Sequence, residues 1–361
     1  MRPTALIDRM ARPAMQVAGM LAVAVVGSLT LAGAAWALPY VVTTVAVGWW
    51  VRSLLRGAQA KAVATDPDGD LRRQFWQFTW PRGFTSVVQV ALQRLDVVLV
   101  SALKSPAEAA LYAVATRFLV VGQLTNSALG LAAQPQLAAL VSRGERDAAN
   151  DLYRTTTAWV MMMNGPLYLV VGAFSPLLLS IFGDSYVKAW PITVALCVAA
   201  FIGNGVGMVD VMLSMAGRTT WNLMNAGLAL TVQVGLDLYL IPRYGAFGAA
   251  MGWGASILTA NLVPLTQLAV VDGLHPFGRS SAWALGLVLL AVGVPVILVM
   301  STMGQTWLAL TVALVVSGAC YAAGLVLLRR QLRVDALVGA LRRNRGPGAD
   351  PALGAGGDPV S

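Results

Sequence analysis

Residues 281–301 read SAWALGLVLLAVGVPVILVMS, and residues 305–328 read QTWLALTVALVVSGACYAAGLVLL. Each run is about 20 residues long and contains no charged side chain, so each can cross a hydrocarbon core of ~30 Å as an α-helix. Strands of a membrane barrel are about 10 residues long and alternate between apolar and polar residues, which neither run does. These two runs therefore predict membrane-spanning helices.

Runs of the same kind recur along the whole chain. The 361 residues are 57% hydrophobic and 11% charged, with a mean hydropathy of +0.70, whereas a soluble domain carries about 25% charged residues. We therefore predict an all-α integral membrane protein with about ten transmembrane helices. They are expected at residues 14–38, 40–56, 80–103, 109–132, 154–182, 188–215, 219–240, 244–270, 281–301 and 305–328. Breaks or turns near the span ends are expected at Pro39, Gly183, Pro191, Gly217, Pro242 and Gly245.

Positive charges set the expected orientation, because cytoplasmic flanks of spans are enriched in Lys and Arg. With the N-terminus inside, 20 of the 25 basic residues lie on the inner side. They are Arg2, Arg9, Arg12, Arg52, Arg56, Lys61, Arg72, Arg73, Arg82, Arg143, Arg146, Arg154, Arg218, Arg279, Arg329, Arg330, Arg333, Arg342, Arg343 and Arg345. Only Lys104, Lys188 and Arg243 lie outside, and Arg94 and Arg117 lie within spans. Both termini are therefore expected in the cytoplasm.

The first apolar run has two interpretations. Three arginines precede it and it ends in Ala35-Trp36-Ala37, which is also the pattern of a cleaved signal peptide. The run is long for a signal sequence, and a second apolar run starts at Tyr40, which favours a retained span.

Several classes of function are not expected. The net charge is +9 and the pI about 10.1, but the basic residues lie at span ends rather than in a patch that would bind nucleic acid. Cys197 and Cys320 lie inside apolar runs, and His275 is the only histidine. A metal site, a disulfide framework and a cofactor are therefore not predicted. The basic segment 329–345 is a cytoplasmic flank or an anchor for anionic lipids.

Polar side chains inside a span are costly and are candidates for function. In the third expected span, Gln89, Gln93 and Asp96 share a helical face, with Arg94 beside them. One interpretation is that Asp96 pairs with Arg94 or Arg117 and holds helices together. The other is that the stripe lines a polar translocation cavity.

The fourth and sixth spans carry further candidates. Arg117, Gln123 and Asn126 lie in the fourth, where the fixed charge of Arg117 suits an anionic headgroup such as a diphosphate; alternatively Arg117 extends to the interface. Asp210, near the middle of the sixth span, is a candidate for coupling to a proton or another cation. Asp237 in the seventh span is expected to pair with Arg243.

Four stretches carry a family resemblance. They are 96–100 (DVVLV) with 105–117 (SPAEAALYAVATR), 181–190 (IFGDSYVKAW), 216–222 (AGRTTWN) and 240–250 (LIPRYGAFGAA). In this order and spacing they resemble polysaccharide flippases of the multidrug/oligosaccharidyl-lipid/polysaccharide exporter superfamily. The resemblance covers roughly residues 14–330.

The resemblance implies a function. Members of this family flip undecaprenyl-diphosphate-linked oligosaccharides across the bacterial plasma membrane by alternating access, through a cavity between two six-helix lobes. Cationic residues of the cavity hold the anionic substrate, and Arg94 and Arg117 lie in spans that would line it. Expected partners are the lipid-linked oligosaccharide, anionic lipids at the cytoplasmic face and, as a further candidate, glycan-assembly membrane proteins.

The same resemblance divides the chain. Residues 1–58 match two helices of a partial N-terminal lobe, and 59–79 form a cytoplasmic loop. Residues 80–270 match a complete six-helix lobe, 281–328 two additional helices, and 329–361 a basic tail, disordered at its end. The first four helices of the family have no counterpart.

Two alternatives remain open. A drug/cation antiporter or a peptidoglycan-precursor flippase of the same superfamily would have the same architecture. A membrane glycan polymerase or acyltransferase would need a large outer loop or catalytic groups on the outer face, and the expected outer loops are short. An enzyme is therefore not predicted.

Overall fold

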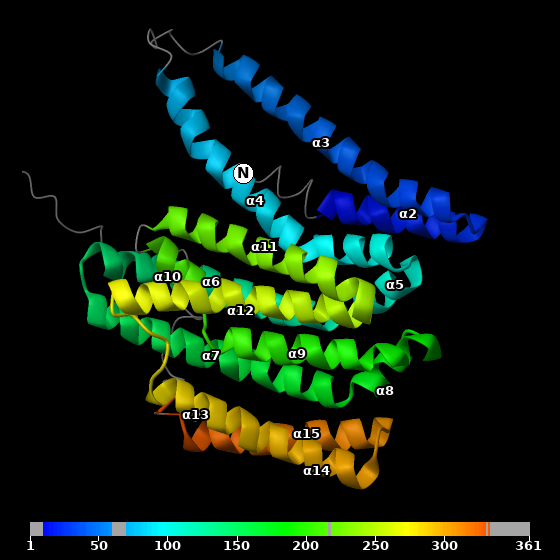
Figure 1. Cartoon of the computed structure of the whole chain (residues 1–361). Coiled ribbons are helices and arrows are strands. Elements are labelled where there is room, and N and C mark those ends of the chain that lie inside the picture. Colours follow the sequence, from blue (N-terminus) through cyan, green and yellow to red (C-terminus); the bar gives the residue numbers. More distant parts are fainter. Residues whose placement is uncertain (1–9, 60–69, 216–217, 330, 333–361) are drawn as a thin grey trace, which may run out of the picture. The chain divides into compact units, whose positions relative to one another are not determined.

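The computed structural model describes residues 10–59, 70–215, 218–329 and 331–332, and these residues contain helices and turns but no strand. This confirms the predicted all-α class. The chain divides into two compact units, Met1–Thr79 and Trp80–Ser361, which are described separately (Figure 1). Residues 60–69 of the predicted cytoplasmic loop lie outside the described residues. So do residues 330 and 333–361 of the predicted tail.

The first unit contains a helical hairpin. Helix α2 (Arg12–Val26) ends at Gly27, which adopts φ 69° and donates its N–H to the Val23 carbonyl. Helix α3 (Leu29–Gln59) then packs back along α2. A Cβ on Gly19 would lie 3.2 Å from the Ala35 Cβ, so the two backbones approach closely there.

The predicted break at Pro39 is wrong, because Pro39 lies inside α3. A proline removes one backbone hydrogen bond, and membrane helices tolerate this loss. The chain reverses instead at Gly27, since glycine adopts the left-handed conformation of a helix end without steric cost.

The second unit begins with the part of α4 (Asp70–Leu103) that follows Thr79. Helices α5 (Pro106–Ala115) and α6 (Arg117–Ser142) follow, bent by 42°. Helix α7 (Arg146–Ala173) leads to the short α8 (Ser175–Ser180) and the 3₁₀ segment η2 (Asp184–Ala189). The bundle is completed by α9 (Trp190–Asn204), α10 (Val209–Met215), α11 (Thr219–Tyr244) and α12 (Ala246–Val271).

Three predicted spans are interrupted rather than continuous. The span 109–132 bends at Thr116, the span 154–182 is interrupted at Phe174, and the span 188–215 is broken between Asn204 and Val209. Gly207 adopts φ 73° within this last break. The interruptions escaped prediction because apolar residues continue through them, and hydropathy does not register a change of backbone direction.

Helix α12 contacts α5, α9, α10 and α11. A carboxylate fixes one of its ends, since Glu108 Oε2 accepts the Ala246 N–H at 3.0 Å. The negative charge at the start of α12 also complements the helix dipole. Gly248 and Gly252 face the Leu240 backbone and the Asp237 side chain on α11, respectively, so α11 and α12 approach closely there.

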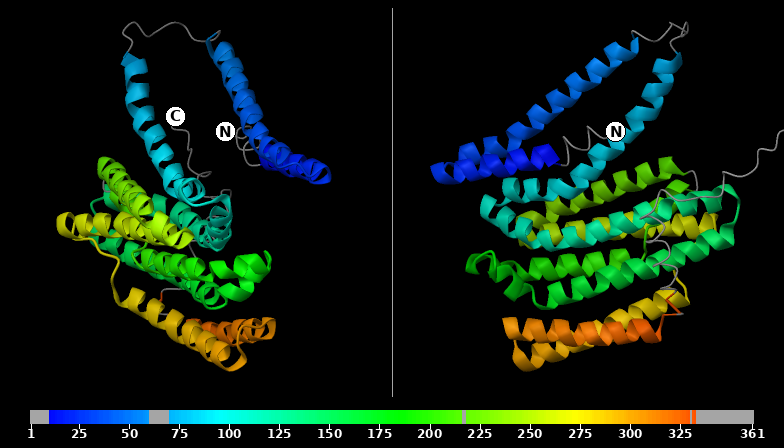
Figure 2. Two further views of the ribbon diagram at one scale, coloured as in Figure 1. Left: turned by 45° about the vertical axis from the view of Figure 1, so that its right-hand side comes forward. Right: turned by 180° about the vertical axis from the view of Figure 1, so that it is seen from behind.

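A C-terminal helix pair packs on α7 (Figure 2). It consists of α13 (Arg279–Val288), the π-helical segment η3 (Leu289–Gly293), α14 (Val294–Met303) and α15 (Trp307–Leu327). The Tyr321 hydroxyl donates to the Met162 carbonyl at 2.7 Å, and Gln305 Nε2 donates to the Ala173 carbonyl at 2.8 Å. These two bonds fix α15 and its preceding turn to α7.

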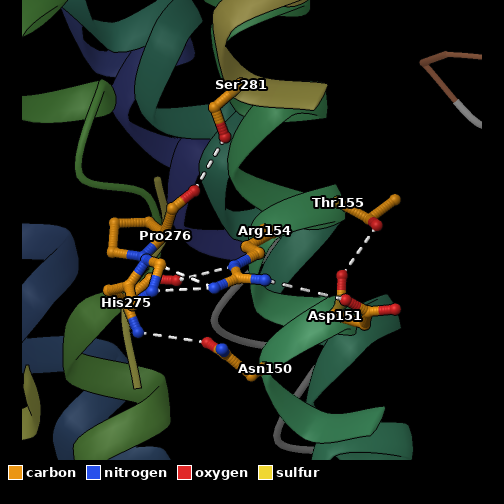
Figure 3. A network of polar contacts seen from close by, with 7 residues as sticks. All are labelled: Asn150, Asp151, Arg154, Thr155, His275, Pro276 and Ser281. Carbon is orange, nitrogen blue, oxygen red and sulfur yellow. Dashed lines mark hydrogen bonds and ion pairs between the residues drawn. The ribbon is translucent and has the colours of Figure 1, made fainter. Parts of the chain in front are cut away.

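The loop between α12 and α13 is fastened to α7 by a polar network (Figure 3). Arg154 Nη2 lies 2.7 Å from His275 Nε2, and its Nε donates to the His275 carbonyl at 3.4 Å. The His275 N–H donates to Asn150 Oδ1 at 3.1 Å, and Ser281 Oγ donates to the Pro276 carbonyl at 2.7 Å. The only histidine therefore serves as an anchor for a loop.

Among the described residues, six segments are long and apolar enough to cross a membrane, and the bent pair α5–α6 is either a seventh, broken span or a re-entrant loop. Helix α2 is 15 residues long, and α4 and α7 are longer but more polar. A multi-pass membrane protein is therefore supported, while spans at α2, α4 and α7 stay a prediction.

Candidate functional site

A cavity of about 540 Å³ opens in the second unit, where α9 breaks before α10. This volume lies within the range of small-molecule sites. Its polar lining residues are Gln123, Asn126, Ser127, Gln134, Tyr168, Asn204, Asp210 and Asn261, and Trp253 also lines it. Most of the polar groups are neutral amides and hydroxyls.

Helix α6 supplies much of this lining because of its residue spacing. Leu119, Gln123, Ser127 and Gly130 recur at intervals of three or four, which places them on one helical face. The opposite wall comes from the break at Gly207, whose absent side chain leaves room for Thr157 of α7. The break thus brings the end of α9 and the start of α10 to the cavity.

A chain of asparagine side chains joins three helices beside the cavity. Asn164 Nδ2 on α7 donates to Asn126 Oδ1 at 2.8 Å, and Asn126 Nδ2 donates to Asn204 Oδ1 at 2.9 Å. Asn204 Nδ2 has no hydrogen-bond partner among the described residues. Leaving a buried amide N–H without a hydrogen-bond acceptor costs about 1–3 kcal/mol. A ligand in the cavity that accepts a hydrogen bond from Asn204 would therefore recover this free energy.

Asp210 is the one carboxylate of the lining, and the described lining contains no Lys, Arg or His. Its side chain is exposed, and the surface that it presents belongs to the cavity wall. The backbone around it is fixed, because Asn222 Nδ2 on α11 donates to the Asp210 carbonyl at 2.7 Å and to Ser214 Oγ at 2.6 Å. The carboxylate is thus held at the cavity by a rigid local structure.

The structure brings three of the predicted site residues together: Gln123, Asn126 and Asp210 line the same cavity. Arg117, at the start of α6, is exposed and does not belong to this lining. Gln93 and Arg94 on α4 are likewise exposed and outside it. The side chain of Gln89 lies outside the described residues.

Of the two interpretations of the polar stripe in the third expected span, the pairing of Asp96 with Arg94 or Arg117 is wrong. Asp96 is buried and accepts a short hydrogen bond from the Tyr112 hydroxyl and another, of 2.8 Å, from the Val97 N–H. A turn of two residues joins α4 to α5, so Tyr112 folds back onto Asp96. Arg94 is within electrostatic reach of Asp96 without forming an ion pair.

The predicted pairing of Asp237 with Arg243 is also wrong. The Arg243 guanidinium lies 3.8 Å from the centre of the Tyr239 ring and donates to the Tyr239 carbonyl at 2.6 Å. Asp237 and Arg243 are six positions apart on one α-helix, so their side chains point in directions about 120° apart around its axis.

Asp237 belongs instead to a second polar cluster, with Asp96, Tyr112 and Gln233. The Asp237 side chain is fully buried against Gly252, and neither carboxylate oxygen has a partner among the described residues. Gln233, one turn earlier, donates Nε2 to the Leu92 carbonyl at 3.3 Å, and its Oε1 is unpaired. Asp96 and Asp237 are close enough to interact electrostatically.

Buried carboxylates are stable when they are protonated, paired or bound to a cation. This cluster therefore has the chemistry to hold a proton or a monovalent cation. The described residues contain no group of three or more His, Cys, Asp or Glu side chains arranged for a metal ion.

Sequence reasoning missed several cavity residues, chiefly Gln134, Tyr168, Asn204, Trp253 and Asn261. The available signal was an amide inside an apolar run, which applies to Asn204 and Asn261 as it did to Asn126. Tyr168 and Trp253 carry no such signal, because aromatic residues are common in every membrane helix.

Comparisons with known proteins agree with this geometry. The MatE family model matches residues 81–236, a range that contains α6, α9 and α10. No curated protein matches the chain. A solved structure of the lipid II flippase MurJ in an inward closed conformation is similar, with a TM-score of 0.68 and 13% sequence identity over 91% of this chain and 68% of that one.

The fold and the comparisons together define the class of protein. The chain is a multi-pass α-helical membrane protein with the fold of that MurJ structure. The match of the MatE family model to residues 81–236 agrees with the resemblance to the exporter superfamily. Membership in the polysaccharide flippases stays a prediction.

Proposed function

We propose that this chain is a membrane transporter that flips an undecaprenyl-diphosphate-linked oligosaccharide by alternating access. The observation that carries the proposal is the cavity at the α9–α10 break, lined by amides and hydroxyls inside a transporter fold. The MatE match and the likeness to a lipid II flippase support the same class.

The lining suits saccharide chemistry. A sugar hydroxyl both donates and accepts hydrogen bonds, and so does a carboxamide. Gln123, Asn126 and Asn204 present such groups from two helices. A site of this kind discriminates against ligands that leave its buried polar groups unpaired.

Arg94 and Arg117 are proposed to hold the diphosphate, since a guanidinium binds phosphate oxygens through two parallel hydrogen bonds. Both are exposed. They lie outside the described cavity lining, so the diphosphate would be bound apart from the saccharide.

Two acidic groups are candidates for coupling transport to a cation. Asp210 faces the cavity, as the sequence-based hypothesis requires. The Asp96–Asp237 pair is buried and has unpaired oxygens, which favours it, because binding a cation there would relieve an uncompensated carboxylate.

The proposal is tested with the purified protein in liposomes that contain a fluorescent undecaprenyl-diphosphate oligosaccharide. Flipping is measured as the fraction of label that becomes accessible to an impermeant quencher. We expect the double variant Gln123→Ala/Gln134→Ala to flip at least about tenfold more slowly, the effect of losing about 1.4 kcal/mol of binding to the moving substrate. The control variant Thr311→Ala, exposed on α15, should match the unmodified protein. Absence of flipping by the unmodified protein would refute the proposal.

A peptidoglycan-precursor flippase is a second candidate, supported by the likeness to MurJ. Complementation separates the two: growth of a strain depleted of its lipid II flippase indicates the precursor, and restored surface polysaccharide in a polysaccharide-flippase mutant indicates the first substrate.

A drug/cation antiporter is favoured by one observation, the carboxylate of Asp210 in a lining without basic residues. Extrusion of a lipophilic cation such as ethidium from loaded vesicles tests it. We expect none, because the amide lining suits hydroxyl-rich ligands better than flat aromatic ones.

Partners at the cytoplasmic face are proposed to be anionic lipids. Arg143 and Arg146 are exposed at the α6–α7 turn, which the charge distribution places inside. Comparing the amount of phosphatidylglycerol that stays bound to the detergent-purified protein and to its Arg143→Ala/Arg146→Ala variant measures this interaction. Association with glycan-assembly membrane proteins is a further proposal.

A further inference from the structure

We propose that Asp210 makes the cavity selective for a saccharide that carries a protonated amino group. This inference rests on the proposed flippase function and names its substrate class more closely. It comes from the charge of the lining, the lack of a countercharge for Asp210, and the groups that surround the cavity.

The first step is the charge of the lining. Among the described lining residues, Asp210 has the only ionisable carboxyl group. The same lining contains no guanidinium, ammonium or imidazole group that could oppose its charge. In a cavity with low-dielectric walls, one uncompensated carboxylate sets the sign of the local potential. The cavity therefore attracts a cationic group and repels an anionic one.

The second step is that the nearest basic residue in the sequence is engaged elsewhere. Arg218 Nη2 donates to Asp272 Oδ1 at 3.1 Å, and its guanidinium lies 4.5 Å from the Trp221 ring centre. The ion pairs found among the described residues do not include Asp210. The described residues thus supply no cation for this carboxylate, and a substrate group can take that place.

The third step is the fit of an ammonium group to the surrounding lining. A primary ammonium has three N–H donors. One can bond to the Asp210 carboxylate, and the lining offers amide oxygens from Gln123 and Asn261 as well as the indole of Trp253. Aromatic faces attract ammonium groups when these are desolvated. The lining therefore combines partners for sugar hydroxyls with partners for a cation.

The same carboxylate provides rejection as well as attraction. A uronic acid in this position would place a second negative charge next to Asp210. Like charges at close range in a partly desolvated site are strongly unfavourable. Selectivity would thus act for amino sugars, against acidic sugars, and with neutral sugars between them.

The test compares two substrates that differ at one nitrogen. A preparation of an undecaprenyl-diphosphate oligosaccharide with one free glucosamine amine is split into two portions. One portion is N-acetylated, which removes the positive charge of that amine. Flipping of both is measured in the liposome assay at about pH 6.5, where a primary amine is protonated. We expect the free amine to be flipped at least about tenfold faster.

Variants then assign the preference to Asp210. Asp210→Asn keeps the size of the side chain and removes its charge, so the rate ratio of the two substrates should fall to about one. Asp210→Glu keeps the charge and should retain most of the ratio. Asp184→Asn, an exposed acid at η2 outside the cavity, is the matched control and should keep the full ratio.

Three outcomes would overturn the inference while leaving the flippase function intact. Equal flipping of both substrates by the unmodified protein excludes selection by charge. An equal loss of both rates in Asp210→Asn, with the ratio preserved, assigns Asp210 to cation coupling instead. A loss of the ratio in both Asp210→Asn and Asp184→Asn excludes a specific contact. If the unmodified protein flips neither substrate, the flippase function itself fails.

Discussion

Two glycines with the same backbone conformation have different surroundings. Gly207 and Gly144 adopt φ 73° and 74°. A Cβ on Gly207 would overlap the Thr157 side chain, whereas one on Gly144 would meet no atom within 4 Å. Both alanine variants carry backbone strain of about 1 kcal/mol, and the collision adds about 1–3 kcal/mol at position 207.

We therefore expect Gly207→Ala to lower the melting temperature in detergent by several degrees more than Gly144→Ala. Adding Thr157→Ala removes two of the three obstructing atoms, Oγ1 and Cγ2, and it should recover part of this difference. Equal melting temperatures for the two single variants would contradict this prediction. They would show that the backbone at the α9–α10 break can shift to accommodate a Cβ without loss of stability.

The Tyr112–Asp96 hydrogen bond is a second residue-scale test. Tyr112→Phe leaves the buried Asp96 carboxylate with the Val97 N–H as its remaining hydrogen-bond donor. We expect a loss of about 1–3 kcal/mol in the free energy of unfolding, the cost of an under-satisfied buried group. Tyr244→Phe, at an exposed position, is the matched control. A melting temperature equal to that of this control would mean that Asp96 does not depend on Tyr112.

The predicted site residues that line the cavity are those that the chemistry of single side chains identifies. The sequence identifies Gln123, Asn126 and Asp210 because a polar side chain inside an apolar span is energetically costly and is a candidate for function. The partners of Asp96 and Asp237 could not be, since they depend on how α4, α5 and α11 face one another. Sequence spacing fixes directions around one helix but not between helices.

At the scale of elements, the helical class was predictable and the interruptions were not. Length and hydropathy identify α11, α12 and α15 directly, because nothing interrupts their apolar runs. Gly27 stops a helix and Pro39 does not, although proline is the stronger helix breaker in a soluble context. In a membrane a helix end requires its carbonyl groups to be satisfied, so chain reversal occurs where glycine permits a capping turn.

The α12–α13 loop gives an element-scale prediction. His275→Ala removes the nitrogen that faces Arg154 Nη2 at 2.7 Å and weakens the fastening to α7 (Figure 3). Losing this bond to a charged group costs about 1.5 kcal/mol, so amides of residues 272–278 should exchange hydrogen about tenfold faster. Exchange measured by mass spectrometry checks this.

The control for the loop is His275→Gln, which keeps a hydrogen-bonding group of similar reach. It should retain much of the protection, provided that the backbone bond to Asn150 stays in place. If both variants exchange like the unmodified protein, Asn150 and Ser281 hold the loop without the imidazole.

At the scale of the whole molecule, the second unit is consistent with one lobe of a transporter and an appended helix pair. Its cavity is formed by α6, α7, α9, α10 and α12 alone. The predicted division into two, six and two helices assigns the first hairpin to another lobe. Alternating access, which the proposed function requires, moves such lobes around a binding site.

The orientation of the chain gives the last prediction, because a single miscounted span would invert everything after it. The basic residues place Glu145, at the α6–α7 turn, inside and Lys104, at the α4–α5 turn, outside. Both positions are exposed. In a variant with Cys197 and Cys320 replaced by alanine, Lys104→Cys should react with an impermeant maleimide in intact cells, whereas Glu145→Cys should react only after the membrane is opened.

The reverse pattern would refute a cytoplasmic N-terminus with two spans before α4. Labelling of both in intact cells would mean that α5 and α6 do not cross the membrane together. The bend of 42° between these helices makes the second outcome informative, because a bent pair either completes one span or returns to the side from which it entered.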